Sequence, residues 1–377
     1  MSDSVTKPVA TCYLLDVGMH RGGHSGSSNI LLLNNSTTRK WPNARISDCN
    51  AIRSDCGDQS RTTLRLLRKY NINKILHILI THNDEDHCGG LLDVLNAFKF
   101  RVGTVWFLQD RPGPRINFYP ELKRLLRDES AIEDVQLSAR EEQNAEDSLF
   151  IVRIEATNKS KHCRDRSQTS LDLRHPLYAE DSMDPQVAED KNSASAILYV
   201  YCGEGAILFP GDAQIETLRR ARDHFSASSR IRCDVLAVPH HGGMISPSRC
   251  TESRLNEFYS STLSIGFAVV SVASENRDRH PFPEHIGALA SQTSHVMCTQ
   301  ITNQCHDNTS SLGESVLVAD CETPQASERA GEANGVGCAG SVVVHLDGGR
   351  IEPRRWKEHQ AAVTALGGKP LCRCSQT

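Results

Sequence analysis

The sequence contains no long hydrophobic run and few aromatic side chains. None of its apolar stretches approaches the ~18 to 20 residues that a membrane-spanning helix requires. The start MSDSVTKPVATCYLLDVG lacks the basic segment and following apolar segment of a secretory leader. Aromatic residues make up 5% of the 377 positions, hydrophobic residues 38% and charged residues 23%. We therefore expect a cytoplasmic globular protein without membrane segments, large enough to bury one extensive core or two modest ones.

The chain also lacks an excess of positive charge. Its 42 Lys and Arg residues stand against 46 Asp and Glu residues, a formal net charge of −4. Nucleic acid could therefore bind only at a local basic surface, and the sequence shows no basic groove interleaved with aromatic residues. Two helical stretches carry several arginines: Arg61, Arg65, Arg68, Arg219, Arg220 and Arg222. These side chains either neutralise phosphates or form solvated helix faces, and the sequence leaves both interpretations open.

Cysteine, in contrast, is abundant, with 14 residues. In a reducing compartment, thiols serve as core residues, metal ligands or redox groups more often than as disulfides. Cys298, Cys305, Cys321 and Cys338 flank a polar, glycine-rich segment that would gain stability from a bound metal, although their spacings match no standard zinc template. Buried free thiols are the default expectation and a structural zinc site is the alternative. Cys88 is expected to be a packing residue, and Cys372 and Cys374 are too isolated to interpret.

Strand and helix patterns alternate along the chain and predict an α/β fold. Strands are expected at 11–18, 29–33, 44–50, 74–80, 233–238 and 266–272, helices at 62–70, 91–98 and 215–225, and hairpins at 195–213 and 340–353. Residues 110–190 carry many charges and one long apolar run, so they are expected to form an insertion or a helical surface layer. Residues 322–337 are small and polar and are expected to be flexible.

Polar side chains follow several expected strands at the point where each strand ends. The stretch THNDEDHCGG, residues 81–90, places two histidines and two aspartates within six positions after an apolar strand. Asp212, the pair His240 and His241, and His280 follow later strands in the same way. A single cluster of this kind is most often a turn. Four clusters at the carboxyl ends of strands, where α/β folds present their chemistry, indicate a shared metal site.

The residue types in these loops suit a pair of divalent ions. Such a pair activates a water molecule and stabilises both the attacking and the leaving oxygen, and it needs about six protein ligands. His82 and Asp84 lie two positions apart on an extended segment, so both can point to one side and bind a first ion. Asp86 and His87 continue around the loop and are expected to bind a second ion.

The motifs as a set resemble the metallo-β-lactamase superfamily. His82-Asn-Asp-Glu-Asp-His87 followed by CGG is similar to the His-x-His-x-Asp-His signature, with aspartate in place of the second histidine. That variant resembles the metallo-hydrolase domain of ComEC-type competence proteins. The segments LLDVG, NSAS, LFPGDA, VPHHGG and NRDRHPFPE occur in the family's order. The resemblance implies one catalytic domain over 11–350, a four-layer αββα sandwich with two mixed β-sheets, followed by a tail at 351–377.

The resemblance also implies roles for residues outside the signature. Asp212 would bridge the ions and His241 would complete a shell. His240, Asn192 and Asp48 would contact and orient the ligands without binding an ion themselves. The segment NSAS stands where the family usually has the histidine that completes the first site. Asp86 would act in catalysis together with His280, which would bind a phosphate oxygen or protonate the leaving group unless it only caps the following helix.

These expectations lead to three functional hypotheses. The first is a two-metal phosphodiesterase or nuclease acting on DNA, RNA or a nucleotide-like ester. Its ions would be Zn²⁺ or Mn²⁺, because the added carboxylate shifts the preference towards harder cations. The second is a lactone, thioester or amide hydrolase on the same fold. The third is a non-catalytic metal-binding module that recruits a protein partner through residues 110–190.

Overall fold

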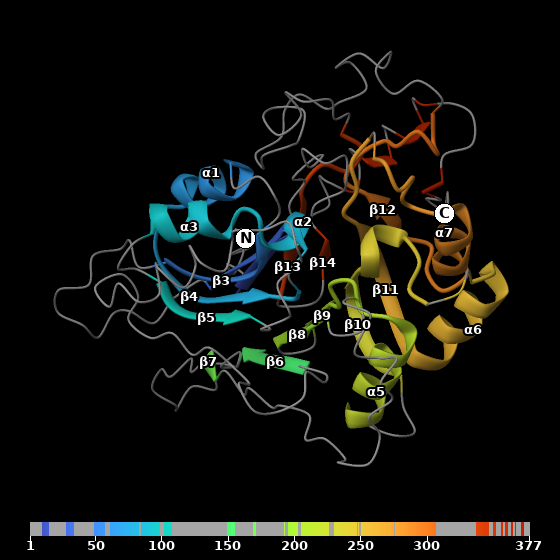
Figure 1. The fold of residues 1–377 in the computed structure, drawn as a ribbon, viewed down its shortest axis with the longest axis horizontal. Helices are drawn as coiled ribbons and strands as arrows, with labels where there is room; N and C mark the ends of the chain where they lie inside the picture. The colour runs from blue at the N-terminus through green and yellow to red at the C-terminus, as the bar shows by residue number, and fades with distance from the viewer. Residues whose placement is uncertain are drawn as a thin grey trace, which may run out of the picture.

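The computed structural model contains two β-sheets packed face to face, with helices on their outer faces (Figure 1). The structure describes residues 10–14, 28–33, 49–56, 61–98 except 83, 102–107, 149–154, 169–170, 192, 195–202, 205–225, 230–306 except 247, 249 and 275, 337–346, 350–351 and scattered positions from 356 to 372.

The first sheet has seven strands in the order β14-β13-β1-β2-β3-β4-β5. It is mixed, because β3, β4 and β5 run parallel while the remaining neighbours are antiparallel. The strands are β1 Ala10–Leu14, β2 Ser28–Leu33, β3 Cys49–Cys56, β4 Ile72–Ile80, β5 Val102–Phe107, β13 Val342–His345 and β14 Arg350–Ile351.

The second sheet also has seven strands and is mixed, in the order β12-β11-β10-β9-β8-β6-β7. Strands β9 to β12 are parallel neighbours, and β8 forms an antiparallel hairpin with β9. The strands are β6 Leu149–Ile154, β7 Thr169–Ser170, β8 Ile197–Cys202, β9 Gly205–Phe209, β10 Ile231–Ala237, β11 Leu263–Val270 and β12 Val296–Cys298.

Helices cover the outer faces of both sheets (Figure 1). Helices α1 Arg61–Lys69 and α3 Leu91–Ala97 lie over the first sheet, and α5 Ile215–Phe225, α6 Glu252–Thr262 and α7 Pro283–Ala290 lie over the second. Two short helical turns, α2 Glu85–Cys88 and the 3₁₀ turn η4 Pro239–Gly242, carry polar residues at strand ends. In the described part of the chain, no helix has the length and apolar character needed to span a membrane.

The hydrophobic core forms two layers that fix this arrangement. Between the sheets, Leu79 and Val344 from the first pack with Val200, Val235 and Val269 from the second. A second layer lies between the second sheet and its helices and includes Leu218, Phe258, Tyr259, Ile286 and Leu289. Because each sheet is covered on both faces, the predicted four-layer sandwich of helices and two mixed sheets is confirmed.

Some elements differ from the sequence-based expectation. Strand β3 begins at Cys49, within the strand expected at 44–50, and continues to Cys56, while residues 44–48 lie outside the described residues. The polar stretch CNAIRSDC is a strand because it pairs with β2 on one side and β4 on the other. Strands β5 and β12 and helix α6 were not predicted. Helix α6 buries Leu255, Phe258 and Tyr259 along a single narrow face, and the hydroxyl of Thr251 caps its first turn.

Two expectations fall on parts of the chain that the structure covers only partly. Of residues 110–190, only strands β6 and β7 lie within the described residues. Of the expected flexible segment at 322–337, only the last residue does. The insertion and the flexibility of that segment therefore stay predictions.

Candidate metal centre

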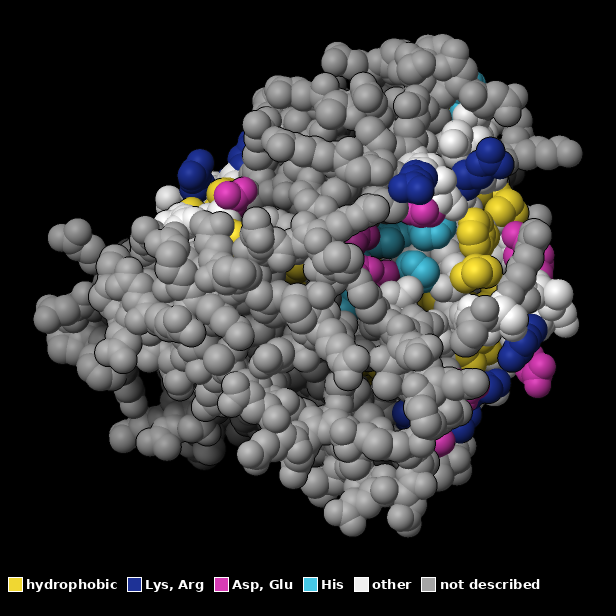
Figure 2. All heavy atoms as spheres, in the orientation of Figure 1, with side chains coloured by type: hydrophobic (Ala, Val, Ile, Leu, Met, Phe, Trp, Pro, Cys, Tyr) yellow, Lys and Arg dark blue, Asp and Glu magenta, His cyan; other side chains and the backbone are white. Residues whose placement is uncertain are grey.

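Four loops converge where strands of the two sheets end. Strands β9, β10 and β11 are parallel neighbours, so their carboxyl ends lie at one edge of the second sheet. The loop after β4 of the first sheet reaches the same place, because its His82 and His87 contact Asp212 from the loop after β9. Figure 2 shows histidine and acidic side chains gathered on one face of the molecule, beside hydrophobic ones.

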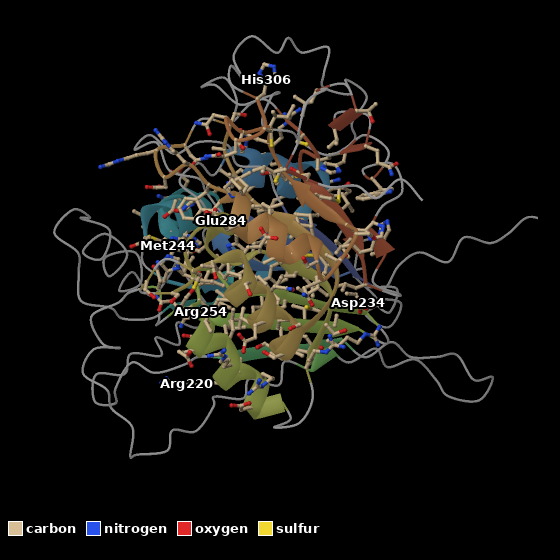
Figure 3. The ribbon with its side chains drawn as sticks, turned by 90° about the vertical axis from the view of Figure 1, so that its right-hand side faces the viewer. Arg220, Asp234, Met244, Arg254, Glu284 and His306 are labelled. Carbon is tan, nitrogen blue, oxygen red and sulfur yellow. The ribbon has the colours of Figure 1, made fainter. Side chains whose placement is uncertain are left out.

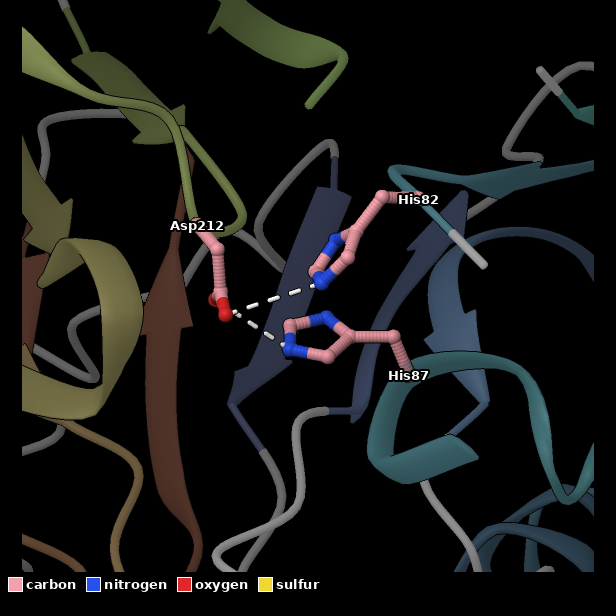
Figure 4. Close-up of side chains that lie close together, drawn as sticks. All are labelled: His82, His87 and Asp212. Atoms are coloured by element: carbon pink, nitrogen blue, oxygen red, sulfur yellow. Dashed lines mark ion pairs between the residues drawn. The ribbon is translucent and has the colours of Figure 1, made fainter. Parts of the chain in front are cut away.

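The carboxylate of Asp212 lies at the centre of the cluster. Its Oδ1 atom is 3.2 Å from His87 Nε2, and its Oδ2 atom is 3.5 Å from His82 Nε2 (Figure 4). His240 Nε2 lies 3.7 Å from Oδ2, and His241 Nε2 lies 4.0 Å from Oδ1. The two oxygens therefore face two different pairs of imidazoles.

The two aspartates of the first loop lie on opposite sides of this centre. Asp86 Oδ2 is 3.4 Å from His241 Nε2 and 3.7 Å from His87 Nε2. Asp84 Oδ2 is 3.8 Å from His82 Nε2. Two sets of three residues have ligand atoms within 4.8 Å of one another, and His87 belongs to both: His82, His87 and Asp212, and Asp86, His87 and His241. All six residues that the sequence indicates as ligands are thus brought together.

The charge state of the cluster suits a cation. Burial alone would raise the pKa of Asp212, but the neighbouring His87, His240 and His82 hold it well below its usual value. Burial, and then the proximity of His87, lowers the pKa of His82. Two buried atoms, His82 Nε2 and Asp212 Oδ1, have no hydrogen-bond partner. A divalent metal site requires ionised carboxylates and neutral imidazoles, and a bound ion would give the two unpaired buried atoms a partner. The residues of the His/Asp cluster therefore fit a divalent metal ion.

Backbone oxygens orient the two histidines of η4. His241 Nδ1 lies 2.8 Å from the backbone oxygen of Ser271. A carbonyl can only accept, so Nδ1 carries a proton, and Nε2 faces the cluster, 3.3 Å from His87 Nε2 and 3.4 Å from Asp86 Oδ2. His240 Nδ1 contacts the backbone oxygen of Met244 in the same way. Both histidines have positive φ angles, 51° and 54°, which for residues other than glycine are uncommon and often mark functional sites.

A buried pair under η4 holds this strained turn in place. His285 Nδ1 donates to the backbone oxygen of Gly243 at 2.8 Å, so its Nε2 accepts from the hydroxyl of Tyr259. Both side chains are buried. Neither of these two positioning residues is predicted from the sequence. Their signal is weak, because a histidine inside a helix and an aromatic residue on a helix face are ordinary core patterns.

The protonation of His285 should make the protein less stable in acid. Burial lowers its pKa to about 4 from an ordinary value of 6.5. The unfolded chain therefore binds the proton more readily, and stability that is complete above pH 6.5 is lost as the pH falls towards 4. From pH 8 to pH 5 the free energy of unfolding should fall by about 2 kcal/mol more in the wild type than in His285→Asn. Urea unfolding of both proteins checks this, and equal slopes would contradict it.

The NSAS segment has a structural role in place of the expected histidine. The hydroxyl of Ser195 accepts a hydrogen bond from the backbone N–H of Asp212 at 3.0 Å. Gly211 has a φ of 55°, and a side chain there would collide with Ser195 and Thr81. The N–H of Ala196 donates to the backbone oxygen of Thr81 at 2.7 Å. Ser195 therefore positions the Asp212 loop against the loop after β4.

Ser195→Ala should weaken this positioning. It leaves the buried Asp212 N–H without its acceptor, which should cost about 1 to 3 kcal/mol of folding free energy. Metal affinity should fall by roughly 10- to 100-fold, as is typical when a group that orients a ligand is removed. Calorimetric metal titration and urea unfolding test both effects. Ser264→Ala, at an exposed position of β11, should change neither quantity.

The remaining candidates occupy varied positions. The ring of His280 is buried and lies 5.3 Å from that of His240 and 6.3 Å from that of His241. Burial, then His241, lowers its pKa to about 3. The N-cap position of helix α7 is Phe282, which makes no side-chain capping bond, so His280 is not the capping residue that the sequence left as an alternative. Asn192 contributes its backbone oxygen, which accepts from the N–H of Ser195. Asp48 lies outside the described residues.

The arginines of α5 pair with acidic residues of their own helix or lie exposed at its surface. Arg219 pairs with Glu216 at 2.9 Å and Arg222 with Asp223, both on the same helix and partly exposed. Figure 3 shows Arg220 at the end of the molecule away from Met244, which follows η4. This arrangement supports the solvated-face reading for α5.

Cysteines divide into packing residues and one group at the end of the second sheet. Cys88 is fully buried beside the metal loop, as expected for a packing residue. Cys298, Cys305 and Cys338 are free thiols, and Cys321 lies outside the described residues.

Comparison with solved structures finds two proteins of low similarity to the chain. The chain is similar to human tRNase Z, short form (ELAC1), with 12% identity over 70% of this chain and 92% of that one and a TM-score of 0.32. It is similar to a diphosphatase from the PhnP family, with 13% identity over 76% and 94% and a TM-score of 0.33. Similarity this low says nothing about substrate. No curated protein matches the chain.

The family assignment rests on a direct sequence match. The model of the metallo-beta-lactamase superfamily matches residues 55–247, slightly more than half of the 377 positions. The matched part includes the β4 loop, the Ser195 turn, Asp212 and the two histidines of η4. Together with the two mixed sheets and a His/Asp cluster that could bind metal ions, this match shows that the chain belongs to the metallo-beta-lactamase superfamily.

Proposed function

We propose that the protein is a two-metal phosphodiesterase or nuclease that acts on DNA, RNA or a nucleotide-like ester. The observation that carries the proposal is the position of Asp212, whose two carboxylate oxygens face separate imidazole pairs. A carboxylate between two groups of ligands is suited to bridge a pair of ions. Bound divalent ions would supply Lewis acidity, lower the pKa of a water molecule and stabilise charge on the phosphate.

Each oxygen of Asp212 defines one proposed ligand set. His82, Asp84 and His240, together with Oδ2 of Asp212, would hold one ion. Asp86, His87 and His241, together with Oδ1, would hold the other. His240 is a change from the sequence-based hypothesis, in which it only supported the ligands. Its Nε2 lies 3.7 Å from Oδ2, so it can supply the nitrogen that the NSAS segment does not. Three carboxylates favour hard cations, and we expect Mn²⁺ to support activity at least as well as Zn²⁺.

The chain's own residues would orient the ester. Asp86, ionised beside His241, would accept a hydrogen bond from the attacking water and so fix its direction. His280 would donate a hydrogen bond to a phosphate oxygen or protonate the leaving group. The side chain of Asn276 fixes its backbone, accepting from the His280 N–H at 2.7 Å and donating to its carbonyl at 2.8 Å.

A cavity beside the centre supports a phosphoester with a bulky substituent. It has a volume of about 450 Å³ and begins at Gly243, next to the two histidines of η4. Met244, Ile245, Leu255 and Phe282 are among its apolar lining residues, and its polar lining is Arg279, Glu284, His285 and Gln304. Met244 and Glu284 lie on the same side of the molecule in Figure 3. A planar base would fit the apolar wall, and Arg279, exposed beside His280, could pair with a phosphate.

A metal-by-substrate screen tests the proposal. Purified protein with Mn²⁺, Mg²⁺ or Zn²⁺ is given labelled single-stranded DNA, RNA, an aryl phosphodiester, a lactone and a thioester. We expect cleavage of a phosphodiester that is abolished in Asp84→Ala and Asp86→Ala and retained in Asp223→Ala, an exposed aspartate on α5. Lactone or thioester turnover without phosphodiester cleavage would favour the second hypothesis. Bound metal with no turnover of any substrate would favour the non-catalytic module.

Two finer points belong to the same proposal. The aspartate at position 84, where the usual signature has histidine, supports a relationship to the ComEC-type domains. A protein partner for residues 110–190 stays a proposal, because that region lies almost wholly outside the described residues.

A further inference from the structure

Four cysteines from separate chain segments gather at the edge of the second sheet, far from the His/Asp centre in sequence. They are Cys298 at the end of β12, Cys305, Cys338 and Cys372, and we name them the thiol cluster. The sulfurs of Cys298 and Cys372 lie 3.0 Å apart although the residues are 74 positions apart in the chain. All four are free thiols.

Backbone contacts bring the other two members beside this pair. The N–H of Ala339 donates to the carbonyl of Cys298, and the N–H of Cys338 donates to that of Thr299, both at 2.9 Å. Cys338 therefore lies alongside the end of β12. The backbone of Leu371 forms a hydrogen bond with Cys305, which ties it to the segment that carries Cys372.

The surroundings favour a bound cation. Cys298 and Cys372 are almost fully buried, and Cys305 and Cys338 are partly buried. The hydrogen bond between Cys372 and Cys298 lowers the pKa of Cys372 to about 5 despite burial, and a hydrogen bond with His359 adds to the effect. The hydrogen bond with Cys372 and burial raise the pKa of Cys298, and burial raises the pKa of Cys305 to about 11. A bound cation would stabilise the thiolate forms of these two side chains.

We propose that the thiol cluster binds one structural zinc ion through Cys298, Cys305, Cys338 and Cys372. Cys372 takes the fourth place that the sequence assigned to Cys321. No three of these sulfurs lie within 4.8 Å of one another, so the ion would draw Cys305 and Cys338 inward to the Zn–S distance of about 2.3 Å. Each thiol that binds as thiolate releases its proton to solvent, and nothing is oxidised. His359 would donate to the sulfur of Cys372 and orient it.

The ion would join the C-terminal segment to the loop that carries His280. Thr299 and Gln300 follow Cys298 directly and bond to the loop after β11. The N–H of Val272 donates to the Thr299 hydroxyl at 2.9 Å, and the N–H of Ser274 donates to the Gln300 side chain at 2.8 Å. Zinc at the thiol cluster would therefore stabilise this region without taking part in hydrolysis.

The test measures thiolate-bound metal directly and is independent of hydrolysis. Full-length protein, kept reduced, is first treated with a chelator to empty the His/Asp centre. A thiol-specific mercurial is then added with a chromogenic zinc indicator. We expect release of one further zinc per chain from the wild type and from Cys250→Ser, a buried cysteine outside the cluster. That zinc should be lost in Cys298→Ser and Cys338→Ser.

A second measurement does not depend on the variants folding. Wild-type protein refolded with Co²⁺ in place of zinc should show the strong sulfur-to-cobalt charge-transfer bands of tetrahedral thiolate coordination. The absence of these bands, or of mercurial-released zinc in the wild type, would overturn the proposal. So would a Cys298–Cys372 disulfide in protein purified under reducing conditions, seen as two cysteines that are alkylated only after the unfolded protein is treated with a strong reductant.

Discussion

Asp212→Asn is expected to abolish hydrolysis while leaving the protein folded. Replacing the carboxylate removes the group that would bridge both ions, and an amide carries no charge to hold either of them. Removing a residue that merely orients a ligand typically costs roughly 10- to 100-fold in metal affinity or activity, so loss of the ligand itself should exceed 100-fold in kcat/KM. Phosphodiester turnover in Mn²⁺ and the number of metal ions bound per chain measure the effect.

The amide variant is chosen because it keeps the shape of the side chain. The N–H of residue 212 can still donate to Ser195, so the loop should keep its position and the circular dichroism spectrum should not change. Asp223→Asn, at the exposed end of an ion pair on α5, is the matched control and should retain full activity. Wild-type turnover in Asp212→Asn would remove Asp212 from the mechanism.

Divalent metal is expected to raise the melting temperature strongly. Metal-free protein holds Asp86 within electrostatic range of the buried Asp212 and leaves His82 Nε2 and Asp212 Oδ1 without hydrogen-bond partners. An ion that binds only the folded state stabilises it by about 2.7 kcal/mol at a free concentration of 100 Kd, and two independent ions would add their effects. For a protein of this size we expect an upward shift of several degrees or more.

Calorimetry with chelator and with increasing Mn²⁺ measures this shift. His82→Ala and Asp86→Ala each remove ligands proposed for one ion, so each should lose part of the shift, and combining them should remove it. Cys298→Ser separates the thiol cluster from this response, because it should keep the Mn²⁺-dependent part. A melting temperature that does not respond to Mn²⁺ in the wild type would contradict the proposed centre.

The local part of the site could be predicted from the sequence. The run of apolar residues in β4 indicates a buried strand, and the spacing of His82, Asp84, Asp86 and His87 indicates ligands on one loop. The four-layer fold followed from the resemblance of the ordered motifs. Both depend on short stretches whose periodicity and residue types are visible without knowledge of tertiary contacts.

The supporting residues could not be predicted, because their roles arise from contacts across the fold. Ser195 meets Asp212 across 17 positions, and His285 meets Gly243 across 42. The orientation of His240 depends on two consecutive left-handed residues in η4, and nothing in the letters PHHGG requires that conformation of histidines. The sequence therefore suggested His240 as a supporting residue, and its proposed role as a ligand depends on the 3.7 Å between its Nε2 and Asp212 Oδ2.

The most direct test of the two-ion centre is a crystal structure of the protein grown with Mn²⁺, with anomalous scattering recorded at the manganese edge. The account predicts two anomalous peaks on either side of the Asp212 carboxylate, about 3.5 to 4 Å apart, one beside His82 and His240 and the other beside His87 and His241. A single peak, or peaks away from Asp212, would contradict it.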